Sequence, residues 1–273
     1  MALFSLSPSK ISTYQDCPRK YRFLYVDKLG PWFRKARPYF TLGSNVHAAL
    51  KDFFAAPTDG RQPERLEPLL EAHWARNRKG FKSAEEEEAY KTRALEQLQQ
   101  FAGTFDPNAE PLMLEQRVHR KVSGVRLRGI VDRVDREGKS AHLMDYKTGK
   151  TQNSMEPFSL YFYSLILQRF KDLPPVERLS YVFLQDGFTK TWEYDHFAAM
   201  QTMSSVLETA YAINADKAFT PSPTRLCRLC DFLSICHEGR EVTMSKAQRA
   251  AAAAEAPQWE REDAFEPIAV AGE

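Results

Sequence analysis

Residues 129–133 read Gly-Ile-Val-Asp-Arg and residues 145–149 read Asp-Tyr-Lys-Thr-Gly, so Asp145 follows Asp132 by thirteen positions. The two stretches are predicted to lie at the ends of paired strands, where alternation puts Asp145 and Lys147 on the same side. A hairpin of this length can also bring Asp132 beside them. Two carboxylates are hard oxygen ligands for a divalent cation, and a nearby ammonium offsets charge that develops on a phosphate. Acidic pairs on hairpins are more often solvated surface, so this pattern alone indicates phosphodiester hydrolysis only as the rarer interpretation.

At these residues the sequence resembles the RecB-like branch of the PD-(D/E)XK nucleases. That branch includes the nuclease domains of RecB and AddB and the CRISPR-associated RecB-like exonucleases. Asp132 stands at the first aspartate of the motif, and residues 145–147 stand at its D/E-X-K element. The resemblance implies that Asp132, Asp145 and the backbone carbonyl of Tyr146 hold Mg²⁺ or Mn²⁺. It also implies that Lys147 orients the attacking water and stabilises the pentacovalent phosphate.

Two further segments extend the resemblance. Residues 43–47, Gly-Ser-Asn-Val-His, look like the family's G-x-x-x-H segment, which implies that His47 is an additional metal ligand. Residues 159–163, Ser-Leu-Tyr-Phe-Tyr, fall where the family usually has Q-x-x-x-Y. Tyr163 fits this pattern, but Ser159 replaces the glutamine, which puts part of the usual substrate-side contact in doubt.

Glu115 lies on the predicted strand before Asp132, where relatives often carry an acidic residue. One interpretation is a strand-end ion pair with a nearby arginine, which is the commoner role for such a residue. The other is that Glu115 positions the metal or its water. The sequence leaves both open.

The four cysteines form the second informative pattern. Cys17 stands alone, and Cys227, Cys230 and Cys236 follow about 210 residues later as C-x2-C-x5-C. Zinc sites usually combine two close pairs, so this arrangement is poor for a local zinc site. The arrangement resembles the [4Fe–4S] staple of AddB-type and CRISPR-associated relatives, for which four thiolates are the ligand set. Zinc and disulfides remain alternatives, the latter disfavoured because we see no secretory segment at the start.

Composition restricts the remaining classes. Hydrophobic residues make up 43% of the 273 residues, which is ordinary for a globular protein, and the net charge of +2 neither requires nor forbids a nucleic acid. No apolar run is long enough for a bilayer, so we expect a cytoplasmic protein without a membrane partner. One predicted hairpin, however, is crowded with basic residues: Arg117, His119, Arg120, Lys121, Arg126 and Arg128. A solvated strand face explains such a cluster about as well as a surface that follows phosphates.

The order of predicted elements indicates an α/β protein. Strands are expected at about 112–119, 125–135, 140–147, 177–185 and 188–194, with helices at about 43–55, 155–170 and 196–216. Together with the resemblance, this predicts a restriction-endonuclease-like core with a mixed central sheet flanked by helices. A helical insertion at about 56–105 would form a cap, and an iron–sulfur staple would join the N- and C-terminal segments. We expect residues 1–240 to form the nuclease domain, with the cysteine cluster at 227–236, and residues 241–273 to form a short helix and a mobile tail.

The resemblance implies a metal-dependent DNA exonuclease that acts at single-stranded ends, in DNA repair or recombination or in CRISPR adaptation. Its expected partners are DNA and either a helicase or the CRISPR adaptation proteins. The main alternative is an inactive accessory module that binds DNA ends within a helicase–nuclease complex. A third interpretation is a binding protein stapled by zinc.

Overall fold

A computed structural model describes residues 4–151 and 155–245 of the chain. The chain divides into two compact units: a larger one from Met1–Gln15 and Lys35–Ala218, and a smaller one from Asp16–Arg34 and Phe219–Glu273. Most of the predicted C-terminal tail, residues 246–273, lies outside the described residues.

The larger unit contains a mixed sheet. Its strands are β1 (Ser5–Leu6), β2 (Glu110–Val122), β3 (Val125–Glu137), β4 (Ser140–Lys147), β5 (Val176–Phe183) and β6 (Phe188–Glu193). They lie in the order β1-β3-β4-β5-β6, and β2 pairs with β3. The β1–β3 and β4–β5 pairs are parallel, whereas β2–β3, β3–β4 and β5–β6 are antiparallel. The long strand β3 therefore connects the two parts of the sheet, and it carries the first half of the motif.

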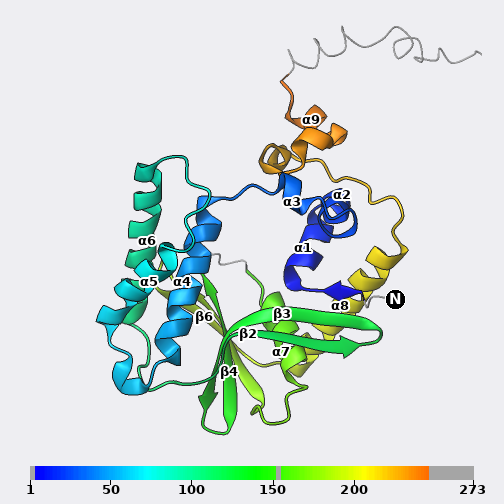
Figure 1. The fold of residues 1–273 in the computed structure, drawn as a ribbon. Coiled ribbons are helices and arrows are strands. Elements are labelled where there is room, and N and C mark those ends of the chain that lie inside the picture. Colours follow the sequence, from blue (N-terminus) through cyan, green and yellow to red (C-terminus); the bar gives the residue numbers. More distant parts are fainter. Residues whose placement is uncertain (1–3, 152–154, 246–273) are drawn as a thin grey trace, which may run out of the picture. The chain divides into compact units, whose positions relative to one another are not determined.

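Helices flank this sheet, as the sequence predicts (Figure 1). The larger unit contains α1 (Pro8–Asp16), α4 (Pro38–Ala55), α5 (Leu66–Trp74), α6 (Ala84–Ala102), α7 (Phe158–Leu167) and α8 (His196–Ala215). In Figure 1, α4, α5 and α6 form a layer on one side of the sheet, and α7 links β4 to β5 on the other. The predicted order of strands and helices from β2 to α8 is confirmed.

Local sequence explains where the helices begin. Asp195 caps α8 by accepting hydrogen bonds from the backbone N–H groups of Phe197 and Ala198, as its sequence position predicts. The helix α4 begins at Pro38, five residues earlier than expected, because proline at the first helical position is preorganised for a helix. This extension adds Tyr39 and Phe40 to the helix that carries His47.

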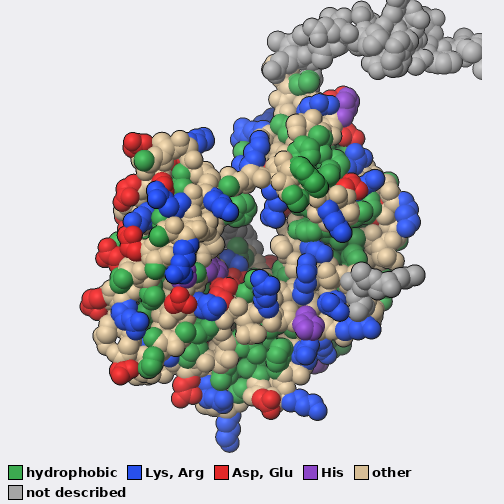
Figure 2. All heavy atoms as spheres, viewed as in Figure 1, with side chains coloured by type: hydrophobic (Ala, Val, Ile, Leu, Met, Phe, Trp, Pro, Cys, Tyr) green, Lys and Arg blue, Asp and Glu red, His purple; other side chains and the backbone are tan. Residues whose placement is uncertain are grey.

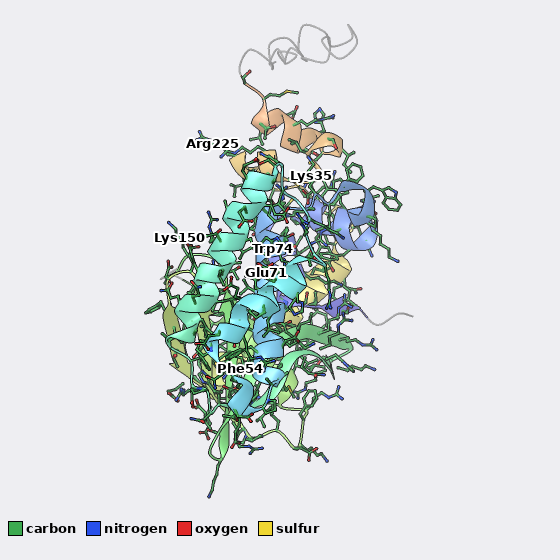
Figure 3. All side chains as sticks on the ribbon, turned by 60° about the vertical axis from the view of Figure 1, so that its left-hand side comes forward. Lys35, Phe54, Glu71, Trp74, Lys150 and Arg225 are labelled. Atoms are coloured by element: carbon green, nitrogen blue, oxygen red, sulfur yellow. The ribbon has the colours of Figure 1, made fainter. Side chains whose placement is uncertain are left out.

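The helical insertion folds against α4 through a shared apolar core. Buried side chains from α4, α5 and α6 meet there, among them Val46, Leu50, Phe53, Leu70, Trp74 and Leu98. Figure 3 shows Phe54 on α4 and Trp74 on α5 within this layer. Tyr146 of β4 belongs to the same core, so α4 is anchored directly to the motif strand. None of the helices within the described residues combines the length and apolar character that a bilayer crossing requires.

The smaller unit joins segments from opposite ends of the chain around aromatic side chains. It contains the short helices α2 (Pro18–Tyr21), α3 (Gly30–Phe33) and α9 (His237–Thr243) and several single turns. The ring of Phe232, which is 1% exposed, lies 5.3 Å from that of Phe23 and 5.7 Å from that of Phe33. The ring of Tyr21 stacks on that of Phe219 with a centroid distance of 6.3 Å.

Candidate metal centre and nucleic-acid interface

A histidine and two carboxylates from three different elements meet in the larger unit. His47 on α4 places its Nδ1 atom 3.0 Å from Oε1 of Glu115 on β2 and 3.5 Å from Oδ2 of Asp132 on β3. Among the described residues, these three form the sole group of three or more His, Cys, Asp or Glu whose ligand atoms all lie within 4.8 Å of one another. One imidazole nitrogen and carboxylate oxygens suit Mg²⁺ or Mn²⁺. The donor set therefore fits the divalent cation that the motif implies.

Glu115 joins this group through an unusual backbone conformation. Its φ of 45° is in the left-handed region, which a non-glycine residue rarely adopts. The adjacent residues Leu114 and Gln116 keep their regular pairing with β3. The conformation is thus local to Glu115, at a site where the carboxylate contacts His47. Such strain persists where surrounding structure enforces it, and it is enriched at functional sites.

Asp145 and Lys147 lie next to this group on β4 and form a close ion pair. The Lys147 ammonium donates to both carboxylate oxygens of Asp145, at 2.7 and 2.8 Å. It also lies 4.8 Å from the centre of the Tyr181 ring. The predicted same-side placement of Asp145 and Lys147 thus agrees with the structure, which pairs them directly. Across the strands, the backbone N–H of Tyr146 donates to Oδ2 of Asp132 at 2.8 Å, which ties β4 to the metal-ligand group.

The residues at the glutamine and tyrosine positions also reach the centre. Ser159 on α7 donates to Oδ2 of Asp145 at 3.2 Å and shares a hydrogen bond of 2.7 Å with the Tyr181 hydroxyl. The replacement of glutamine by serine therefore retains a contact with the acidic centre. Tyr163 packs against the backbone of β3, where a Cβ on Gly129 would lie only 2.4 Å from its ring, so this position requires glycine. Burial raises the pKa of Tyr163, and the carboxylates of Asp145 and Asp132 raise it further.

Proton affinities in the centre follow from burial and from these contacts. Burial alone would lower the pKa of His47, but its hydrogen bonds to Asp132 and Glu115 raise the pKa to about 10. Burial would raise the pKa of Asp132, but the hydrogen bond and charge of His47 hold it below its ordinary value. Burial raises the pKa of Asp145 to about 6; Lys147 opposes the rise and Asp132 adds to it. The raised pKa of His47 thus reflects its contacts with two carboxylates, those of Asp132 and Glu115.

A row of basic side chains leads away from this centre along β2 and β3. Lys121 lies opposite Arg126, His119 opposite Arg128, and Arg117 opposite Ile130. Residues opposite one another in an antiparallel pair share a face, so basic side chains crowd one exposed surface. We call Arg117, His119, Lys121, Arg126 and Arg128 the basic ladder. Figure 2 shows Lys, Arg and His side chains gathered over this hairpin.

The sequence predicts six basic residues on this hairpin, and the basic ladder contains five of them because Arg120 lies on the other face. Arg120 points away from it and donates to the backbone carbonyl of Leu165 on α7. No ion pair neutralises a ladder side chain within residues 4–151 and 155–245. Like charges in cross-strand positions destabilise a sheet, which favours a role for this surface in binding an anion.

Two hollows in the surface connect the ladder to the acidic centre. One, with a volume of about 410 Å³, is lined by ladder residues, and the other, of about 630 Å³, is lined by His47 and Glu115. Arg117 and Ile130 line both hollows, so the two are contiguous.

All four cysteines belong to the smaller unit and none forms a disulfide. Cys17 and Cys236 directly precede α2 and α9, and neither side chain makes a capping hydrogen bond to its helix. Burial raises the pKa of the Cys230 thiol, and Cys227 and Cys17 raise it further, so these thiols interact electrostatically. Burial also raises the pKa of Cys236, with Glu238 and Cys17 adding to the rise. Among the described residues, no three cysteine sulfurs lie within 4.8 Å of one another, so the structure does not show the predicted iron–sulfur site.

Comparisons with solved structures found matches of low similarity. The chain is similar to the crystal structure of SSO0001, with 16% identity, a TM-score of 0.37, and coverage of 86% of this chain and 87% of that chain. It is also similar to the crystal structure of protein VC1899 from Vibrio cholerae, with 15% identity, a TM-score of 0.24, and coverage of 80% and 59%. No curated protein matches the chain in sequence.

The family model of the PD-(D/E)XK nuclease superfamily matches residues 5–237 of the chain. These residues include both halves of the motif and His47. This match spans most of the chain. The chain therefore belongs to the PD-(D/E)XK nuclease superfamily.

Proposed function

We propose that this protein is a Mg²⁺- or Mn²⁺-dependent exonuclease that hydrolyses DNA from single-stranded ends. The observation that carries this proposal is the convergence of His47, Glu115 and Asp132, with the Asp145–Lys147 pair beside them. A nuclease that has lost activity is not expected to retain His47, Asp132, Asp145 and Lys147 together. The proposed exonuclease activity and the proposed preference for single strands rest on the motif resemblance.

In this proposal His47, Asp132 and Asp145, with the backbone carbonyl of Tyr146, hold the cation. Glu115 contributes either directly or through a bound water, because its carboxylate lies 3.0 Å from the same imidazole. A bound divalent cation would polarise the scissile phosphate and lower the pKa of a coordinated water.

The remaining groups of the centre act on charge and orientation. Burial would lower the pKa of Lys147, but Asp145 raises it, so Lys147 remains an ammonium beside the reacting phosphate. That positive charge would offset the charge that develops during attack and orient the water. Ser159 and the Tyr181 hydroxyl would keep the Asp145 carboxylate in place, because Ser159 bonds to both. The basic ladder would hold the phosphates that flank the cleavage site.

We further propose that the four cysteines bind a [4Fe–4S] cluster with a structural role. A unit as small as this one has a limited apolar core, and small domains usually need a disulfide, a metal or a partner for stability. Because Cys17 is distant in sequence from the other three, a shared cluster would fix both chain segments of the unit. The proposed hydrolysis needs no electron transfer, so the cluster is not part of the reaction.

The alternative function is an inactive module that binds DNA ends within a helicase–nuclease complex. The replacement of the family glutamine by Ser159 is the observation that favours it. A helicase or a CRISPR adaptation complex is the proposed partner in either case. The two functions are distinguished by whether the protein cleaves DNA or only binds it.

The deciding experiment is digestion of single- and double-stranded DNA labelled at either the 5′ or the 3′ end, with Mg²⁺, Mn²⁺ or EDTA. We expect metal-dependent release of short products from single strands, lost in Asp145→Asn and Lys147→Ala. Lys35→Ala, which changes a lysine that lines neither hollow, serves as the control for loss of a positive charge. DNA binding without cleavage in either metal would support the accessory module instead.

A further inference from the structure

Two aromatic side chains are exposed to solvent at the start of α4. Tyr39 is 52% exposed and Phe40 is 57% exposed, and their ring centroids lie 4.5 Å apart at an interplanar angle of 50°. Neither side chain belongs to the apolar core of the helical layer. About half of each side chain therefore remains open to solvent, outside that core.

These rings line the same hollow as the candidate metal ligands. The hollow of about 630 Å³ is bounded by Tyr39 and Phe40 at one end of α4 and by His47, Lys51 and Glu115 farther along. His47 follows Phe40 by seven positions, which corresponds to about 10 Å along a helix axis. That distance matches one to two nucleotides of an extended strand.

Between the two rings and His47, the face of α4 that lines the hollow carries only small side chains. Gly43 and Ser44 line the hollow there, so no bulky side chain of α4 separates the aromatic pair from the metal ligands. A Cβ at Gly43 would also come within 3.3 Å of Oγ1 of Thr148, in the loop that follows the motif. A nucleotide next to a metal-bound phosphate can therefore lie along this face and reach the rings.

The surrounding charges suit a nucleic-acid strand. Lys51 and Arg117 line the same hollow, and Arg117 continues into the basic ladder. A cationic track for phosphates combined with exposed rings for bases is how proteins bind single strands without reading their sequence. The bases of a duplex are paired and stacked on their neighbours, so apart from the outer face of a terminal pair their faces are not available to such rings.

We propose that Tyr39 and Phe40 form a stacking platform for an unpaired base one or two nucleotides from the cleaved phosphate, and that this platform selects single-stranded substrates. The inference rests on the proposed nuclease function and names the residues that give it strand selectivity. It assigns Tyr39 and Phe40 to binding of the substrate and gives them no part in the bond-breaking step.

The test measures binding in a chain that cannot cleave. Asp145→Asn is combined with Tyr39→Ala/Phe40→Ala, and affinities are measured for a single-stranded oligonucleotide and for the corresponding blunt duplex in Mg²⁺. We expect the affinity for the single strand to fall about 5- to 100-fold, the range of one stacking contact. The affinity for the duplex should change by less than about twofold.

Two comparisons separate stacking from other effects. Tyr39→Leu/Phe40→Leu keeps apolar surface but removes the flat rings, so it should lose single-strand affinity like the alanine variant, whereas Tyr39→Trp/Phe40→Trp should retain it. Phe197→Ala removes an aromatic ring that is 67% exposed on α8 and lines neither hollow, and it should change neither affinity.

A fluorescent base gives an independent readout. 2-Aminopurine placed within two nucleotides of the end should be quenched on binding to the Asp145→Asn chain, and this quenching should be lost in the alanine variant. Equal losses for single strand and duplex, or unchanged single-strand affinity in a folded variant, would overturn the platform. Because binding needs no turnover, a wild-type chain that never cleaves DNA would refute the nuclease function while leaving this test intact.

Discussion

The side chain of Asp132 and the backbone of Tyr146 are joined by a hydrogen bond of 2.8 Å from the N–H group to Oδ2. This bond connects the two halves of the motif, which lie on β3 and β4. It holds the Asp132 carboxylate against the strand that carries Asp145 and Lys147. The same oxygen lies 3.5 Å from the His47 ring, so one carboxylate contacts both the sheet and α4.

The two roles of Asp132 can be separated by substitution. Asp132→Asn keeps an oxygen that accepts from Tyr146 but removes the negative charge. We expect the variant to fold normally and lose at least about 100-fold in metal-dependent activity, since loss of even an outer partner of a metal ligand costs about 10- to 100-fold. Asp132→Ala should also lower the free energy of unfolding, by about 1–3 kcal/mol, because it leaves the N–H group unpaired. Full activity in Asp132→Asn would remove Asp132 from the site.

A buried ion pair next to the motif predicts a large stability effect. Arg133 is 4% exposed and Asp135 is 6% exposed; Nε of Arg133 donates to Oδ1 of Asp135 at 2.7 Å. The guanidinium also lies 3.4 Å from the centre of the Phe54 ring. Arg133→Met leaves Asp135 buried without its partner and should cost about 3–5 kcal/mol in urea unfolding.

The double variant Arg133→Met/Asp135→Leu tests whether that cost arises from the unpaired charge. Replacing both partners of a buried pair by apolar side chains is often close to neutral. We therefore expect the double variant to recover most of the stability lost by the single one. The single variant Asp135→Leu completes the comparison. A loss in the double variant equal to the sum of the two single losses would show that the two residues do not act as a pair.

His142 on β4 predicts a pH dependence of stability that is independent of the metal centre. It is 8% exposed and shares a hydrogen bond of 2.7 Å with Ser180 on β5. Burial and, to a smaller extent, the charge of Arg178 together lower its pKa from 6.5 to about 4. Glu137 bonds to the other ring nitrogen, but Arg178 lies 3.0 Å from the same carboxylate oxygen and offsets its charge.

The unfolded chain therefore binds a proton at His142 before the folded chain does. Stability from this residue is complete above pH 6.5 and falls as the pH drops toward 4, by about 2 kcal/mol between pH 6.5 and 5. His142→Gln keeps a polar partner for Ser180 but cannot take up the proton. Urea unfolding at pH 7, 6 and 5 should show a smaller decline for the variant than for the wild type, and parallel declines would contradict the shifted pKa.

The cysteine proposal is tested by composition and by local stability. A [4Fe–4S] protein is brown and contains iron and acid-labile sulfide, whereas a zinc protein contains neither. Cys17→Ala or Cys230→Ala should lose iron and lower the melting temperature, because either change frees one segment of the smaller unit. Phe197→Ala again serves as a surface control. Full iron content and unchanged melting in either cysteine variant would show that the four thiols do not form one site.

The sequence alone was sufficient for the local features of this protein. The alternation of side chains along a strand places Asp145 and Lys147 together, and the structure shows them in direct contact. The Asp195 cap and the order of strands and helices follow from capping chemistry and hydrophobic period in the same way. Strand alternation, helix capping and hydrophobic period depend on residues that are close in the chain. They can therefore be predicted without knowledge of the tertiary structure.

Only the tertiary structure decided which distant groups meet. Glu115 joins His47 and Asp132 because three elements converge and its backbone adopts a left-handed conformation. The sequence left the role of Glu115 open, and that conformation has no sequence signal. Arg120 leaves the basic surface for a carbonyl on α7, and Arg133 is buried against Phe54, although both read as ordinary strand arginines. Tyr39 and Phe40 reach the site because α4 starts five residues earlier than predicted. These outcomes depend on packing between segments far apart in sequence, where small differences in burial and charge decide among locally equivalent arrangements.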